Sequence, residues 1–403
     1  MKTGIMIVGG GILQIPALIK AKDMGLTTHL TDRMVNCAAK KYADYFYRVD
    51  TKDVEANSKL AVELRKANKI QGVYTQGTDV EYTVASAAQK AKLPGIDPEV
   101  ALNCNDKYKM RILLRKHGIE NMHFYKARTF GEFKRAVGII GFPCYVKPLN
   151  NSASRGVTRL TNGKNLVSAF KVATENSFSA QGILVESEIA GNEYSVDTIL
   201  FNGKLYPAGI SDRVFLKKNK YAIQVGSRTP SQLPEKTQAN IYELMNRAAK
   251  ALGVTNGAFK GDIVVDKKNK IRIIEVTART SGGFDSQFRK PLSFGVDLIK
   301  ATLDIALGKP LDPLDLIPKW VKWSSTISVM AGPGRVKKIA GVNKIKRSKG
   351  VHRVFMLVKK GDLIKPYFNC ADRTNYVICH ADTLEKLINI ENMVHKNLII
   401  KVS

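Results

Sequence analysis

The chain has 403 residues, enough for two or three domains, with hydrophobic and charged contents (44% and 25%) that are ordinary for a globular protein. Its five scattered cysteines contain no Cys-x-x-Cys pair, which argues against a zinc site or a disulfide framework and favours a reducing cytoplasm, and no run of about twenty apolar residues predicts a membrane span. The net charge of +29 would attract polyanions, but the lysines are spread along the chain, so we expect a solvated basic surface, with nucleic-acid binding as the minor alternative.

The first hundred residues alternate strands and helices. Strands are expected at 5–10, 27–32, 45–50 and 70–76, with helices at 12–25, 54–69 and 79–92. Strands separated by helices of this length predict a parallel, doubly wound sheet. The stretch 93–106 carries two prolines and a glycine, so it predicts a link into a second domain.

The opening turn raises the question of a nicotinamide or flavin cofactor. Gly9 and Gly11 fit the start of a Gly-x-Gly-x-x-Gly fingerprint, and Asp32 follows the second strand. Gln14 stands where the third glycine should allow the helix to pack closely on the strand. The strand–turn–helix prediction therefore holds, whereas an oxidoreductase becomes the weaker hypothesis.

The middle of the chain mixes helices with antiparallel strands. Helices are expected at 107–119, 235–253 and 293–308, strands at 142–148, 182–191 and 192–211, and a hairpin at 257–276. The stretch 309–318 has three prolines and predicts another boundary, and the remainder is strand-rich with a helix near 381–397. We therefore expect three domains: 1–103, 104–312 and 313–403.

Two lysines and a loop of small residues in the middle region are typical of phosphate binding. Lys147 ends a buried strand, and the loop 149–157 that follows can lay backbone N–H groups over phosphates. Lys107 opens the first helix after the link. Glu186 and Glu193 flank a tight turn and could reach an adenine amino group and ribose hydroxyls of one ligand.

The end of the predicted hairpin combines acidic, hydroxyl and basic side chains. Asp262 lies on one arm, and Glu275, Thr277 and Arg279 share one face of the other arm, because side chains alternate along a strand. Two carboxylates and a hydroxyl beside an arginine can hold Mg²⁺ between phosphate oxygens while the arginine stabilises the transferred charge.

Taken together in their order along the chain, the elements described above resemble those of the ATP-grasp superfamily. The resemblance covers nearly the whole chain. The resemblance implies a doubly wound N-terminal domain that helps to bind the acceptor, so that Gln14 is no defect, then an ATP-grasp domain and a small strand-rich closing domain. It implies that Lys107 and Lys147 contact ATP phosphates, with Lys147 and Arg279 as catalytic residues. Asp262 and Glu275 would hold Mg²⁺ or Mn²⁺, and Thr277 stands where the family has asparagine.

The same resemblance implies the remaining site residues. The lid over the phosphates would comprise Ser152, Ala153, Ser154, Arg155 and Gly156. Adenine would be held by Glu186, Ser187, Glu188 and Ile189, and the ribose by Glu193. The glycine turn Ser281, Gly282 and Gly283 would line the acceptor pocket, and the candidates for gripping a substrate carboxylate are Arg213, Arg228 and Arg289.

These expectations lead to an ATP-dependent carboxylate–amine ligase. ATP phosphorylates a carboxylate, and an amine captures the acyl phosphate to give an amide or peptide bond, ADP and phosphate. Two alternatives stay open: an enzyme that activates bicarbonate, as carboxylases and carbamoyl-phosphate synthetases do, and a polyanion-binding protein whose ATP site has decayed. We expect a small-molecule acid and amine as partners, without membrane or nucleic acid, and leave a homodimer open.

Overall fold

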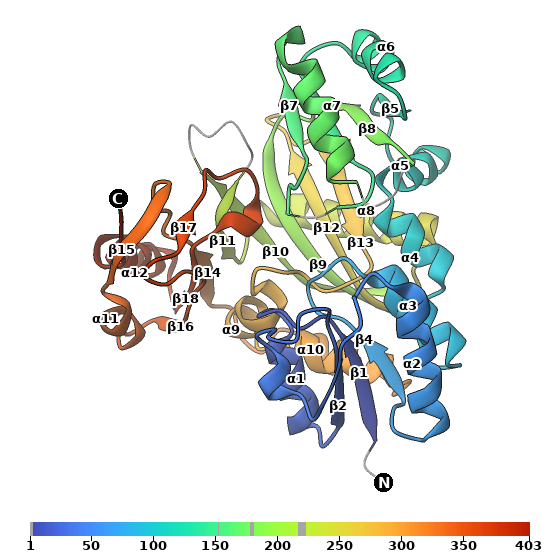
Figure 1. Ribbon diagram of the computed structural model, residues 1–403, viewed down its shortest axis with the longest axis vertical. Coiled ribbons are helices and arrows are strands. Elements are labelled where there is room, and N and C mark those ends of the chain that lie inside the picture. The colour runs from blue at the N-terminus through green and yellow to red at the C-terminus, as the bar shows by residue number, and fades with distance from the viewer. Residues whose placement is uncertain (1–2, 152, 178–180, 217–222) are drawn as a thin grey trace.

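The N-terminal part of the chain is a parallel sheet covered by helices on both faces (Figure 1). The computed structural model describes residues 3–151, 153–177, 181–216 and 223–403. The sheet has the order β3-β2-β1-β4, with β1 (Gly4–Val8), β2 (Thr27–Thr31), β3 (Tyr45–Tyr47) and β4 (Gly72–Tyr74). Its helices are α1 (Ile15–Asp23), α2 (Val54–Lys66) and α3 (Glu81–Lys90).

Strand β1 is buried on both faces, as expected for a doubly wound sheet. Ile5 and Ile7 pack with α1, whereas Met6 and Val8 pack with α2 and α3, because alternate side chains leave opposite faces. Helix α10 (Leu298–Ala306) completes the first of these two cores, although it lies far away in the sequence. Gly72 allows this contact, since a Cβ there would lie 2.5 Å from the carbonyl oxygen of Ala306.

The predicted link at 93–106 contains a helix. Asp97 caps α4 (Pro98–Asn105) by accepting a hydrogen bond from the Glu99 amide at 2.7 Å, and Pro98 occupies the first turn. Proline lacks the amide hydrogen that the first turn leaves unused, so it begins a helix as readily as it ends one. The sequence analysis did not predict this helix, and the link into a second domain at 93–106 stays a prediction.

The sheet that follows is antiparallel and small. Its order is β5-β8-β6-β7, with β5 (Phe124–Ala127), β6 (Cys144–Pro148), β7 (Thr158–Leu160) and β8 (Ile183–Ser187). Helices α6 (Phe130–Ile140) and α7 (Leu166–Glu175) cover one face, where Phe133, Val146 and Val185 are buried. The functional side chains of β6 and β8, Lys147 and Glu186, lie away from that core.

The largest sheet joins middle and C-terminal strands in one surface. Its order is β13-β12-β9-β10-β11-β14-β18-β16. Its strands are β9 (Asn192–Phe201), β10 (Lys204–Phe215), β11 (Gln224–Thr229), β12 (Gly257–Val265), β13 (Ile271–Thr277), β14 (Trp323–Ile327), β16 (Val351–Met356) and β18 (Asn375–Ala381). The amphipathic helix α8 (Glu235–Leu252) packs on one face with α5 (Lys107–Lys116), where Met245 contributes to the core. The opposite face of β9, β10, β12 and β13 contributes to the site.

The remaining elements close the C-terminal part, which lies beside the end of β11 (Figure 1). They are a π-helical turn (Asp285–Arg289), α9 (Lys290–Phe294), β15 (Gly334–Ala340), α11 (Val342–Lys346), β17 (Leu363–Ile364), α12 (Leu384–Asn397) and β19 (Ile399–Val402). Short 3-10 turns lie at Lys40–Tyr42, Gly163–Asn165, Pro313–Leu316 and Cys370–Asp372. In the described ranges, every helix is too short or too polar to span a bilayer. The fold is the mixed α/β class expected from the sequence.

Candidate active site

A polar cavity of about 500 Å³ lies where the two antiparallel sheets, the first N-terminal turn and the C-terminal segment around 370–376 meet. Most of the residues that the sequence singled out line it: Lys107, Lys147, Ala153, Ser154, Arg155, Glu186, Ser187, Ile189, Glu193, Arg213, Asp262, Glu275, Arg279, Ser281, Gly282, Gly283 and Arg289. The fold thus brings side chains that lie up to about 180 residues apart in the sequence together around one cavity.

A few of the expected residues lie elsewhere. Gly156 is not part of the lining, and Ser152 falls outside the described residues. Glu188 accepts a hydrogen bond from Arg159 at 2.8 Å at an exposed edge. Arg228 is held by Glu391 of α12, with Nη2 and Oε2 2.6 Å apart, so it ties the C-terminal helix to the large sheet.

The two expected phosphate lysines approach the cavity from different elements. Asp106 caps α5 and places Lys107 in its first turn, where Nζ donates to the carbonyl oxygen of Asn151 at 2.9 Å and lies 3.1 Å from Oε2 of Glu275. Burial works against the charged form, but Glu275 outweighs it and raises the pKa of Lys107. Lys147 stands opposite, at the end of β6, and pairs with Glu186 of β8.

Arg111, which the sequence analysis did not single out, forms a buried ion pair with Glu186. Its guanidinium is 1% exposed and lies 3.1 Å from Oε2 of Glu186, while Nη1 and Nη2 donate at 2.7 Å to the carbonyl oxygens of Ile273 and Ile274. Burial alone would raise the pKa of Glu186, yet Arg111 and Lys147 hold it below the ordinary value. Glu186 is therefore an ionised positioning group for Lys147.

The two candidate metal carboxylates face each other across neighbouring strands. Asp262 of β12 and Glu275 of β13 are register partners in the antiparallel pair. Lys260, two residues before Asp262 on the same strand, has Nζ 2.6 Å from Oδ2 of Asp262, and Arg213 lies 3.3 Å from Oδ1. Burial opposes ionisation of Glu275, but the lysines around it, Lys107 first, hold its pKa far below the usual range. The period-two pattern of β12 could have revealed Lys260.

This donor set suits Mg²⁺ that is bound chiefly through phosphate oxygens. Carboxylate oxygens are the hard ligands that Mg²⁺ takes, and one or two of them suffice beside substrate phosphates. Across the described ranges, no three or more His, Cys, Asp or Glu side chains gather as a metal cage. The third expected ligand, Thr277, lies outside the main cavity, next to a void of about 10 Å³ beside Asp79 and Glu275. Of the three expected ligands, Asp262 and Glu275 therefore line the main cavity and Thr277 does not.

The glycine turn after β1 does not present the features of a dinucleotide site. Asp32, which would have to meet a ribose, accepts hydrogen bonds at 2.8 Å from the amides of Gly10 and Met34. Gln14 is buried, donates to the carbonyl oxygen of Gln76 and lines the main cavity. This turn therefore forms one wall of the cavity that Lys107 and Lys147 also line.

The comparisons with known proteins agree with this geometry. Residues 140–287 match the model of an ATP-grasp domain, and residues 327–403 match that of the L-amino acid ligase C-terminal domain 2. The middle of the chain thus contains an ATP-grasp domain.

The individual proteins that resemble this chain include two ligases and a biotin carboxylase domain. The alanine–anticapsin ligase of Bacillus subtilis is 27% identical over 251 residues, which are 57% of this chain and 52% of that protein, so the match spans about half its length. The crystal structure of an L-amino acid ligase from Bacillus licheniformis superposes with a TM-score of 0.86 at 22% identity, covering 100% of both chains. The biotin carboxylase domain of Hydrogenobacter thermophilus 2-oxoglutarate carboxylase, solved as a dimer with MgADP and bicarbonate, gives 0.76 at 18% identity, covering 100% and 91%.

The matched domain and these proteins place the cavity in an ATP-grasp fold. In the ATP-grasp site, Arg279 follows β13 and reaches back to the N-terminal part of the chain. Its Nε donates to Oδ1 of Asp79 at 2.6 Å and lies 3.3 Å from Oε1 of Glu81. These carboxylates outweigh the effect of burial and raise the pKa of Arg279. Arg279 is thus a permanently charged group, fixed by residues about 200 positions earlier.

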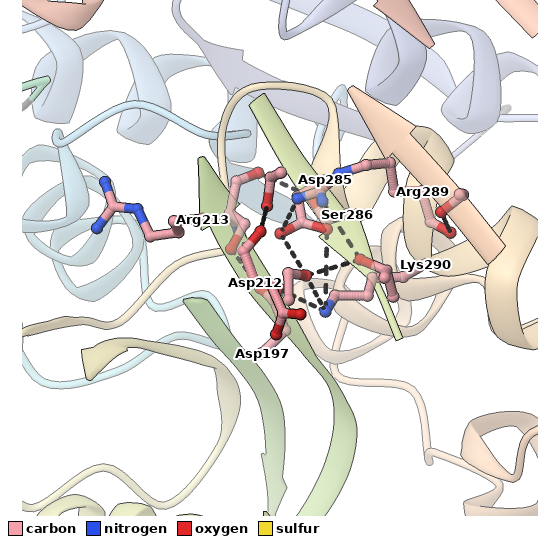
Figure 2. Close-up of polar contacts among 12 residues, drawn as sticks. Asp197, Asp212, Arg213, Asp285, Ser286, Arg289 and Lys290 are labelled. Carbon is pink, nitrogen blue, oxygen red and sulfur yellow. Dashed lines mark hydrogen bonds and ion pairs between the residues drawn. The ribbon is translucent and has the colours of Figure 1, made fainter. Parts of the chain in front are cut away.

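The far end of the ATP-grasp cavity carries a buried, charge-balanced cluster (Figure 2). Asp285 and Arg289 pair across the π-helical turn, with Oδ2 and Nη2 2.6 Å apart. Lys290 is fully buried; its Nζ donates to the hydroxyl of Ser211 at 2.9 Å and lies 3.6 Å from Oδ2 of Asp197. Asp285 and Arg289 line the cavity, and Lys290 stands behind them. Sequence reasoning had found only Arg289 among these charges.

The C-terminal segment supplies a further cation. Arg373 lines the cavity, donates to the carbonyl oxygen of Gln224 at 2.7 Å and to the hydroxyl of Tyr376 at 3.1 Å, and lies beside Gly283. Its sequence context, outside any motif, did not distinguish it from the other basic residues. The ATP-grasp cavity is therefore completed by residues beyond position 370.

Proposed function

We propose that this chain is an ATP-dependent carboxylate–amine ligase that joins amino acids. One observation carries the proposal: a single cavity joins two phosphate-seeking lysines and two opposed carboxylates at one end to the Asp285–Arg289 pair at the other. The match to an L-amino acid ligase C-terminal domain supports amino acids as substrates.

The chain's own residues would position ATP. Lys107 and Lys147, held by Glu275 and Glu186, are preorganised cations that meet the phosphates, and Asp262 and Glu275 would hold Mg²⁺. When bound, Mg²⁺ neutralises charge on the phosphate oxygens. The loop around Ala153–Arg155 would cover the phosphates, Ser187 and Ile189 would contact adenine, and the Glu193 carboxylate would accept from the ribose.

The proposed reaction has two displacement steps. A carboxylate oxygen of the first substrate bonds to the γ-phosphorus, and the bond from phosphorus to the ADP oxygen breaks. The free amine of the second substrate then bonds to the acyl carbon, the bond from carbon to the phosphate oxygen breaks, and the proton from nitrogen goes to the departing phosphate. Arg279, fixed by Asp79 and Glu81, would stabilise the charge on the transferred phosphoryl group.

The Asp285–Arg289 pair offers complementary charges to a zwitterionic substrate. Arg289 lines the cavity, and its buried Nε has no hydrogen-bond partner among the described residues, so we propose that its guanidinium meets a substrate carboxylate. Asp285 could accept from an ammonium group, and Arg373 stands on the C-terminal side of the same region. Arg213 is committed to Glu193 and Asp262, so it belongs to the nucleotide end.

The test is ATP-dependent phosphate release with Mg²⁺ and the L-amino acids, supplied singly and in pairs, with products identified by mass spectrometry. Dipeptide formation that Glu275→Ala abolishes and Lys267→Ala, at the exposed hairpin turn, leaves intact supports the proposal. Turnover that requires bicarbonate instead would indicate a carboxylase-like enzyme. No ATP binding, together with binding of polyanions, would indicate a decayed site.

The assembly, location and division of the chain are also proposals. We infer a cytoplasmic protein, because its five cysteines are free, as a reducing compartment favours. A homodimer is our hypothesis for the assembly, which light scattering would test. The three domains 1–103, 104–312 and 313–403 stay a prediction for limited proteolysis, although the large sheet continues across residue 312.

A further inference from the structure

A second cavity, of about 540 Å³, lies between the N-terminal sheet and the outer end of the large sheet. Helix α3, the loop around Pro94–Ile96, the ends of β9 and β12, and helix α10 enclose it. Its volume falls within the range of about 300–1,000 Å³ that is typical of small-molecule sites. Among the described residues, Arg279 is the one that lines both this cavity and the active site.

The walls of this interdomain cavity are mainly apolar. Val84 and Ala85 of α3 face Phe201 of β9 and Ile305 of α10 across it. Such a lining favours the carbon skeleton of a ligand, because burying apolar surface is worth about 25 cal/mol per Å². A polar group in this cavity must therefore find its partner at a few defined points.

Glu81, at the start of α3, is the acidic group among them. Its side chain is 2% exposed, and within the described part of the chain Oε1 has no hydrogen-bond partner. Oε2 accepts from Nδ2 of Asn105 at 3.3 Å, and the nearest cation, Arg279, stands 3.3 Å from Oε1. Burying a carboxylate oxygen without a hydrogen-bond donor costs free energy, and a donor on a bound ligand would remove that cost.

The electrostatics of Glu81 agree with a missing cation. Burial and the neighbouring Asp79 carboxylate raise the pKa of Glu81 to about 7, although Arg279 acts in the opposite direction. Asp79 shares the same arginine through a hydrogen bond of 2.6 Å. Asp79 and Glu81 therefore share one guanidinium, but Lys107 also acts on Asp79, so Glu81 is the carboxylate that a further positive charge would relieve.

We propose that the interdomain cavity binds a small apolar amine, whose ammonium group pairs with the Glu81 carboxylate while its hydrocarbon part fills the space between α3 and α10. An ammonium group would supply this carboxylate with both a hydrogen-bond donor and a further positive charge.

Binding there also reaches the active site through Arg279. A bound ammonium takes over part of the charge of Glu81, so the positive charge of Arg279 acts more strongly on the phosphate side. We therefore expect the amine to activate ATP turnover; this consequence, unlike the binding itself, rests on the proposed ligase function.

Calorimetry with 3-methylbutylamine and the neutral 3-methylbutan-1-ol at pH 8 tests the binding. The amine is expected to bind at least about tenfold more tightly than the alcohol, which corresponds to about 1.4 kcal/mol. Glu81→Gln is expected to remove that preference, and Ala85→Leu to block both compounds by filling the cavity. Glu63→Gln, an exposed change on α2 with the same loss of charge, is expected to leave binding unchanged.

Equal affinity for amine and alcohol in the unchanged protein would overturn the proposal, as would amine binding that survives Ala85→Leu. Retained ADP binding shows that each variant is folded. If Glu81→Gln does not fold, the effect of Ala85→Leu on amine binding still tests whether the amine binds in this cavity. Amine binding without any ligase activity would contradict the proposed function and leave the site standing. Ligase activity without amine binding would support the proposed function and overturn the amine site.

Discussion

Replacing Glu186 by glutamine tests the buried ion pairs that this carboxylate forms with Arg111 and Lys147. The change keeps the size of the side chain and removes the negative charge that Arg111 and Lys147 share. Removing one partner from a buried ion pair costs about 3–5 kcal/mol, because the other charge stays buried without compensation. At roughly 2–4 °C per kcal/mol for a cooperative unit of about 200 residues, the midpoint of thermal unfolding should fall by roughly 10 °C.

The pH dependence gives this prediction a second readout. Burial would raise the pKa of Glu186, but Arg111 and Lys147 together hold it below the ordinary value of 4.5. A depressed carboxylate pKa contributes stability that is complete above the unfolded-state pKa and is lost as the pH falls through the folded-state pKa. The stability difference between the parent chain and Glu186→Gln should therefore be constant near neutral pH and narrow below about pH 4.5.

The assay is thermal unfolding followed by circular dichroism at pH 7 and at several values below 4.5. Glu175→Gln is the matched control, because its pair with Lys171 is exposed on α7 and should contribute less than about 0.5 kcal/mol. An unfolding midpoint of Glu186→Gln within 1 or 2 °C of the parent, roughly 0.5 kcal/mol, would refute the reasoning. So would a difference that stays constant in acid.

Four further changes test the site. Glu275→Ala should lower ATP turnover by about 100-fold or more while the fold is retained, because it removes a proposed metal ligand; near-normal turnover would reject that role. Lys147→Ala should raise the KM for ATP about tenfold or more, whereas Lys267→Ala should not, and equal effects would mean that only bulk charge matters. Thr277→Val should leave the Mg²⁺ requirement unchanged, because the hydroxyl lies outside the main cavity; a raised requirement would restore it as a ligand. Lys260→Met should raise the ADP concentration needed for half-saturation, measured by calorimetry, since a cation beside Asp262 is lost; unchanged binding would confine Lys260 to a structural role.

Local patterns in the sequence were sufficient wherever a residue's neighbours along the chain decide its conformation. Glycine in the left-handed region at Gly253 ends α8 where the pattern predicted, and the hairpin around 267–269 joins β12 and β13. Period-two alternation put Glu275 on one face of its strand, and the register of the hairpin places it opposite Asp262. One local element was not predicted, the helix that begins at Pro98, because proline in the first turn of a helix looks like proline in a linker until the cap is seen.

Tertiary structure alone decided which charges share a partner. Arg279 meets Asp79 and Glu81, and Arg373 enters the cavity from the C-terminal part, through contacts that no spacing along the chain encodes. Thr277 shows the converse: alternation gives it the same face as Glu275, yet it borders a small void and not the main cavity. A strand pattern fixes the side to which a residue points, whereas the packing of the N-terminal part against β13 decides what it meets there, since that contact joins surfaces about 200 residues apart.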